Sequence, residues 1–171
     1  MSQYPSIPAG VRLTTLLLSS MVPFFIRKAG DTNRNTTTVV AADPDLQIAL
    51  EANATYRIRM VIHYSAGSAG GFKTQWSVPS GATGLRSCWG VGTSPTSTTD
   101  PQGDGRWGIH GFTTDTSYGT RNSTNQVAAI EEGDITTTTA GTLALMWAQT
   151  ASSATDTRVA GRSYLEIRRL A

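Results

Sequence analysis

The sequence is poor in charged residues, cysteine and histidine, and each shortage excludes a class of protein. Only 15% of its 171 residues are charged, against about 25% in ordinary soluble proteins. A soluble helical protein would need more Glu and Lys on its surface. The single cysteine, Cys88, excludes an intrachain disulfide and leaves the redox compartment open. We expect it to be a small buried hydrophobic group.

Long apolar runs are also lacking, which argues against a membrane partner. No segment approaches the roughly 18 consecutive apolar residues that span a bilayer. A secretory signal peptide would place its charge at Arg12 and its apolar region at residues 13–25. We disfavour it because prolines precede that region and no small-residue cleavage site follows Ile26.

A concentrated basic surface is missing as well. The net charge is +2, and the arginines are scattered except for a small group at residues 158–169. Proteins that bind nucleic acid normally carry a basic stripe with interleaved aromatic residues. We therefore expect no nucleic-acid partner.

The residues that usually carry catalysis or bind metals are sparse. The two histidines, His63 and His110, fall in separate predicted strands and match no zinc spacing. There is no nucleophile elbow, phosphate loop or dinucleotide fingerprint, and residues 100–105 indicate a turn. We predict no catalytic residue, cofactor or metal site, and disfavour an enzyme acting on cell-wall polymers.

What the chain does have is hydrophobic residues that alternate with polar ones, a pattern typical of β-strands. Weaker strands are expected at 86–91, 107–113 and 126–131, and no βαβ alternation occurs. The pattern predicts an all-β, antiparallel β-sandwich of jelly-roll type. The strong alternating segments are 22–26, 46–50, 56–64, 72–78, 143–147 and 165–167. Turn residues separate them at 43–45, 51–53, 67–71 (a hairpin turn), 79–81, 132–134 and 160–161.

The first 21 residues differ from the rest and predict an extended arm with one short helix. Two prolines preclude a helix at its start, and Thr14 or Thr15 is a suitable N-cap for a helix that ends before Pro23. We interpret residues 1–21 as a docking segment and residues 22–171 as the sandwich. The side chains expected to dock are Tyr4, Pro5, Ile7, Pro8, Leu13, Leu16 and Leu17.

The four tryptophans divide into two pairs. Trp76 and Trp147 alternate in register with core residues, so we expect both in the core. Trp89 and Trp107 flank the longest predicted loop, residues 92–105. They are expected to pack at its base or, alternatively, to line a surface that binds carbohydrate or protein.

Seven segments carry a resemblance to a known family: 4–14 (YPSIPAGVRLT), 17–23 (LLSSMVP), 43–46 (DPDL), 51–56 (EANATY), 76–83 (WSVPSGAT), 141–149 (GTLALMWAQ) and 160–170 (AGRSYLEIRRL). They resemble small virion proteins from tailed phages and prophages of actinobacteria, which are often labelled minor tail proteins. The resemblance covers nearly the whole chain. It implies a place in a phage particle and supplies no catalytic residues.

Together these features predict a non-enzymatic virion protein, tail-associated or capsid-decorating, assembled in the host cytoplasm. Its expected partners are other virion proteins and further copies of itself, with a trimer favoured. The weakly charged outer faces around Val61 and Met146 motivate that self-association. The alternative is a carbohydrate-binding module for a glycan of the host surface.

Overall fold

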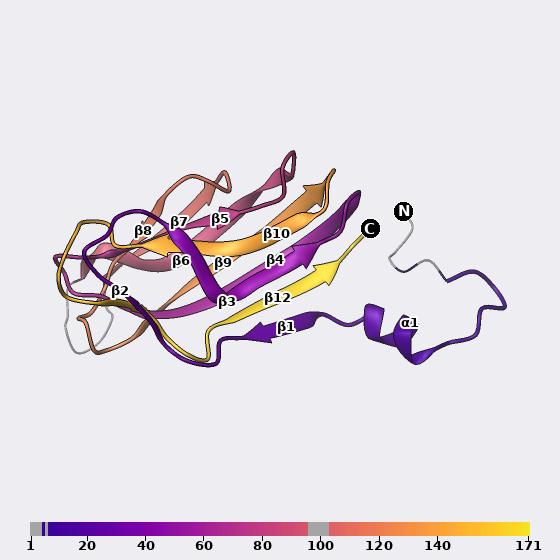
Figure 1. Cartoon of the computed structure of the whole chain (residues 1–171), viewed down its shortest axis with the longest axis horizontal. Helices are drawn as coiled ribbons and strands as arrows, with labels where there is room; N and C mark the ends of the chain where they lie inside the picture. Colours follow the sequence, from indigo (N-terminus) through magenta and orange to yellow (C-terminus); the bar gives the residue numbers. More distant parts are fainter. Residues whose placement is uncertain (1–4, 6, 96–102) are drawn as a thin grey trace.

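The protein is a sandwich of two antiparallel β-sheets with one short helix outside it, as Figure 1 shows. The computed structural model describes residue 5 and residues 7–95 and 103–171. The predicted all-β sandwich is confirmed.

The two sheets differ in size. The first has eight strands. Its main path is β1 (Phe24–Arg27), β12 (Tyr164–Arg169), β4 (Ala54–Ser65), β9 (Val127–Thr137), β6 (Thr83–Pro95) and β7 (Gly103–His110), with β2 (Thr32–Arg34) and β11 (Thr157–Val159) attached. The second sheet has four strands, in the order β3 (Ala41–Leu50), β10 (Gly141–Ala148), β5 (Phe72–Ser77) and β8 (Thr116–Tyr118).

The strand order is that of a jelly roll. If β3 to β10 are counted from one to eight, the second sheet has the order 1-8-3-6. The corresponding part of the first sheet has the order 2-7-4-5. This pairing of two four-stranded sheets is the double Greek key of jelly rolls. The jelly-roll prediction is therefore confirmed at the level of topology.

The two ends of the β domain form an added ribbon beside this jelly roll. Strand β1 pairs with β12 and β2 pairs with β11, and both β11 and β12 pair with β4. Lys28 fastens the ribbon to the second sheet, because its buried Nζ lies 2.9 Å from Asp43 Oδ1 and 3.1 Å from Asp45 Oδ2. The ribbon thus covers the edge strand β4.

The core lies between the sheets and is built from the predicted alternating rows. Ile58, Met60 and Ile62 of β4 point inward and have no exposed surface. Leu145 and Trp147 of β10 face them from the second sheet, also fully buried. The predicted core positions of Trp76 and Trp147 are confirmed.

A buried polar cluster, which the sequence did not predict, joins the two sheets. Arg86 of β6 and Glu131 of β9 form a fully buried ion pair with 2.6 Å between Nη1 and Oε2. From the second sheet, the Trp76 indole donates to Glu131 at 2.6 Å and the Tyr118 hydroxyl donates at 2.8 Å. The hydroxyl of Thr74 also donates to Glu131. The cluster supplies the partners that a buried charge requires.

The first predicted row, at residues 22–26, is wrong as a core row. Val22 is 61% exposed and Phe24 is 58% exposed, and only Ile26 packs partly against the core. The reason is position. Strand β1 is the edge of a path of six strands that faces a sheet of four, so the second sheet does not cover it.

Two predicted turns lie inside strands. Residues 132–134 are part of β9, where a Cβ on Gly133 would lie 2.5 Å from the Leu85 carbonyl oxygen. That glycine serves close strand packing instead of a turn. Residues 43–46 of β3 stand opposite one residue of β10, Leu145. There the Asp43 carboxylate accepts the backbone N–H groups of Asp45 and Leu46 at 3.0 and 3.1 Å.

Two connections also differ from prediction. Residues 67–71 are not a hairpin turn, because β4 and β5 belong to different sheets. The predicted loop 92–105 is largely the extension of a hairpin, since β6 runs to Pro95, β7 begins at Gly103, and these two residues pair. Residues 96–102 lie outside the described part.

Candidate assembly surfaces

The described part of the arm, residue 5 and residues 7–21, projects away from the sandwich. Figure 1 shows its helix α1 (Thr15–Ser20) beyond the end of β1 and clear of both sheets. The predicted helix and its N-cap are confirmed, because the Thr14 hydroxyl accepts the Leu17 N–H at 3.2 Å. The other backbone hydrogen bonds found in the described arm outside the helix's own join Val11 to Pro8, Leu18 to Thr14 and Met21 to Leu18, all within the arm. The arm therefore has little to hold it to its own domain.

The arm exposes most of its apolar side chains. Ile7 is 41% exposed, Leu13 59% and Leu18 51%. A helix of six residues is too short to be stable alone in water. The arm therefore carries an apolar surface that the described sandwich does not cover.

The residues predicted to dock are only partly placed by the structure. Pro8 and Leu13 are exposed, while Pro5 and Leu17 are half-buried. Tyr4 lies outside the described residues, and so does the side chain of Leu16. Their role in docking stays a prediction.

A second apolar surface crosses the outer face of the first sheet. Its residues are direct cross-strand neighbours on β12, β4, β9, β6 and β7, so their side chains share one face. We call this row the outer stripe; it consists of Tyr164, Val61, Ile130, Trp89 and Trp107.

Exposure is lowest at Val61 and rises from there toward the β7 edge. Val61 is only 9% exposed, whereas Trp107 is 72% exposed. Ile109 and Leu85 continue the apolar surface there, at 70% and 57% exposed. At the opposite end the ring of Phe25 lies 6.3 Å from that of Tyr164. The outer face therefore carries an apolar band from one edge of the sheet to the other.

Charged residues flank this band. Glu132 bridges Arg59 at 3.0 Å and Arg57 at 3.2 Å. Next to them a shallow hollow of about 380 Å³ is lined by Leu85, Trp89 and Asp134, among others. Asp134 is exposed and makes no ion pair within the described residues. An apolar surface with a polar rim is typical of a protein contact.

The structure brings Trp89 and Trp107 together as a cross-strand pair. Trp89 is half-buried and lines the hollow, whereas Trp107 is too exposed for packing at a loop base. The sequence analysis did not predict Leu85 and Ile109 as surface residues of this site. Their alternation with Arg86 and Gly108 could have indicated that they lie on the outer face.

The groups with chemical reactivity lie apart. His63 is on β4 and His110 on β7, with β9 and β6 between them. Among the described residues no three His, Cys, Asp or Glu side chains gather as metal ligands. Burial, and next the charge of Glu131, raises the pKa of the Cys88 thiol, which lowers its nucleophilicity. No helix in the described ranges is long and apolar enough to cross a membrane.

Comparison with known proteins adds little. No family model matches the sequence, and no curated protein sequence matches it. Chains of two strains of infectious bursal disease virus, Gt and Gx, align with TM-scores of 0.22 and 0.21 at 11% and 12% identity. These alignments cover 86% and 94% of this chain, which spans 42% and 44% of theirs. Similarity this low carries no argument about function.

Proposed function

We propose that the protein is a non-enzymatic structural component of a phage virion that joins the particle through its arm. One observation carries this proposal. The arm exposes Ile7, Leu13 and Leu18 and projects away from a domain whose core is complete without it. A segment of this kind gains order when it docks on another subunit.

The particle context comes from the sequence resemblance to actinobacterial phage proteins, which stays a prediction. Jelly rolls occur in viral capsids, lectins and cupins, so the fold is compatible with this role but does not decide it. Within the particle we favour attachment to the tail over decoration of the capsid, on the label that the family usually carries. The protein would assemble in the host cytoplasm, as a trimer, with other virion proteins as partners.

Deletion of residues 1–21 tests the proposal. We expect the truncated protein to fold but to be missing from purified particles, measured by quantitative mass spectrometry of virions. A finer variant replaces Leu13 and Leu18 with Ser. Its matched control is Val39→Ser, which removes a still more exposed side chain (75%) from the sandwich. Normal incorporation of the truncated protein would refute the role of the arm.

A second candidate function is carbohydrate binding, and the exposure of Trp107 favours it. A tryptophan that is 72% exposed offers a flat face to a sugar ring, and its cross-strand partner Trp89 lines the hollow in which Asp134 is a hydrogen-bond acceptor. A glycan array with the purified protein tests this function. Binding that is lost in Trp107→Ala would support it, and an array without signal would count against it.

A further inference from the structure

We propose that the arm of one copy docks on the outer stripe of a neighbouring copy. This inference rests on the arm acting as a docking segment, and it names the partner as a second copy of the same chain. The surface covered would extend from Tyr164 to Trp107 and include Leu85 and Ile109.

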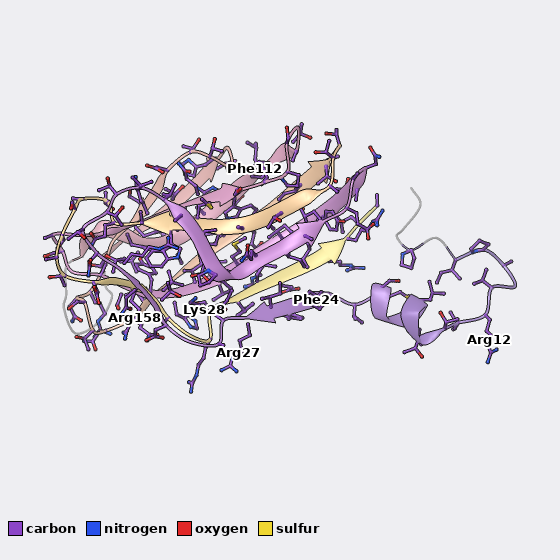
Figure 2. The ribbon with its side chains drawn as sticks, viewed as in Figure 1. Arg12, Phe24, Arg27, Lys28, Phe112 and Arg158 are labelled. Carbon is purple, nitrogen blue, oxygen red and sulfur yellow. The ribbon has the colours of Figure 1, made fainter. Side chains whose placement is uncertain are left out.

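The two surfaces match in apolar character, and each lacks a cover within one molecule. The arm leaves the body at Pro23, beside Glu166 and Arg168 on the outer face, and then runs away from the sheets. Figure 2 shows Arg12 far out on the arm, away from the sandwich. Docking on a second copy would bury both surfaces at once.

One charge on each surface can pair with the other. The first acidic residue in the chain is Asp31, so the arm contains no acid, and its single charged side chain is Arg12. On the outer face, Asp134 is the cross-strand neighbour of Leu85 and is an exposed carboxylate without an ion pair in the described part of the chain. Arg57 stands opposite it on β4 but pairs with Glu132, so Asp134 offers Arg12 an opposite charge beside Leu85.

The dimensions also agree. Four steps between strands separate β12 from β7, which is about 20 Å at the usual spacing. Residues 7–21 reach up to roughly 50 Å when extended, and the short helix reduces that length only in part. One arm is therefore long enough to cross the whole stripe.

Such a contact joins two different surfaces, so repeated docking either closes on itself or continues as an open filament. Reciprocal exchange of arms closes a dimer, and cyclic exchange closes a ring. The trimer proposed above corresponds to the cyclic case. Each copy would then contribute one arm and one outer stripe, and no copy would keep its apolar band exposed.

Cross-linking of the full chain tests the proposal. Ser20→Cys places a thiol on α1, and Ser87→Cys places one beside the stripe, between Leu85 and Trp89. The native Cys88 is fully buried, so we expect its thiol not to react with the maleimide. The two single variants, carrying different tags, are mixed and treated with a short bis-maleimide. We expect a covalent pair that contains both tags.

The matched control pairs Ser20→Cys with Thr142→Cys, an exposed position on the second sheet. Equal yield with this control, or no product with Ser87→Cys, overturns the proposal. The double variant Ser20→Cys/Ser87→Cys detects docking within one chain. If the double variant gives only a cross-linked monomer and the mixture of single variants gives no product, the arm docks within its own chain. That result also overturns the proposal.

A charge exchange tests the contact of Arg12 with Asp134. We expect Arg12→Glu and Asp134→Arg each to weaken self-association about tenfold in sedimentation equilibrium, and the double variant to restore it. Trp107→Ala should weaken it about thirtyfold, as for a central aromatic of an interface. If the double variant does not regain self-association, Arg12 and Asp134 do not contact each other.

The outcomes also separate this inference from the proposed function. If cross-linking fails while deletion of residues 1–21 still abolishes incorporation into particles, the arm binds a different virion protein. The proposed function then stands, and the self-docking inference falls.

Discussion

Buried charge is the main feature of this protein at the scale of single residues. Two ion pairs, Lys28–Asp43 and Arg86–Glu131, have side chains with no exposed surface. The first pair joins the added ribbon to the second sheet, and the second lies within the first sheet, where Trp76 and Tyr118 of the second sheet bind Glu131. Removing one member of such a pair leaves the other charged and unpaired in the interior, which costs more than the pair itself contributes.

Glu131→Ala is expected to lower the free energy of unfolding by about 3–5 kcal/mol, because Arg86 would remain buried without its counter-ion. Urea denaturation measures the loss. Asp115→Ala is the matched control. It breaks the partly exposed ion pair with Lys73, 2.9 Å long, and should cost about 1 kcal/mol or less. Equal losses of unfolding free energy in the two variants would show that the buried cluster stabilises the fold no more than an exposed ion pair does.

Trp147→Ala is expected to lower the free energy of unfolding by about 3–5 kcal/mol, the usual loss for a buried large aromatic. The residue is fully buried, and its indole donates to Asp43 at 3.1 Å. Trp107→Ala, at a side chain 72% exposed, should change stability by less than about 1 kcal/mol. Chemical denaturation of both variants is the test. A loss below about 1 kcal/mol for Trp147→Ala would contradict its place in the core.

Two buried tyrosines predict how stability depends on pH. Burial raises the pKa of Tyr64, and burial together with Glu131 raises the pKa of Tyr118, from the ordinary value of 10.0. Above about pH 10 both phenols therefore ionise in the unfolded chain but stay protonated in the folded one. Stability should fall there by about 1.4 kcal/mol per pH unit for each phenol.

Tyr64→Phe provides the control for this pH dependence. The variant lacks one of the two phenols, so its stability should fall less between pH 10 and 11, by about 1 kcal/mol. Urea titrations at several alkaline pH values give the slopes. Identical slopes for the variant and the parent would contradict the assignment.

The alternating rows made Trp76 and Trp147 predictable from sequence, whereas the buried charges were not. A charged residue in a strand looks like part of its solvated face. Whether it lies inside depends on a partner that folding brings near, and Arg86 and Glu131 are 45 positions apart. The exposure of Trp107 was likewise not predictable, because it depends on the edge position of β7, which the sequence does not reveal.

At the scale of elements, β1 marks the boundary between the arm and the body. It pairs with β12 along four residues, and Lys28 follows it directly. Upstream of Phe24 the chain has no strand partner in the described residues. We therefore expect the β domain to depend on residues 24–30 and not on those before them.

Two truncations test this boundary. Deletion of residues 1–21 should change the free energy of unfolding by less than about 1 kcal/mol, because exposed residues contribute little. Deletion of residues 1–30 should cost about 3 kcal/mol or more, since it removes Lys28 from the buried Asp43 carboxylate. Urea midpoints of the two proteins decide. A large loss in the shorter truncation would mean that the arm belongs to the body.

Turn residues were a weaker guide than hydrophobic alternation. Gly133 follows two glutamates and precedes Asp134, a composition typical of a turn. In the structure it lies inside β9 because the neighbouring strand approaches too closely for a side chain. Residues 43–45 keep the local hydrogen bonds of a turn, yet the strand pairs on both sides of them. Short polar segments do not reveal whether pairing resumes beyond them.

At the scale of the whole molecule, the jelly roll buries one face of each sheet and leaves the arm and the outer stripe without partners. The fold class followed from the sequence because each row needed a second sheet to cover it. The location of the apolar outer band did not, since it depends on which strands are neighbours. Association through these two surfaces is what the virion role proposed here requires.

A cryo-EM map of the intact phage particle that contains this chain tests the central claim most directly. We predict density for the β domain on the particle surface, with residues 1–21 ordered against another subunit. Three copies around an axis, each arm lying on the outer stripe of the next, would support both proposals. Isolated copies whose arms contact no neighbouring subunit, or particles that lack the chain, would contradict the account.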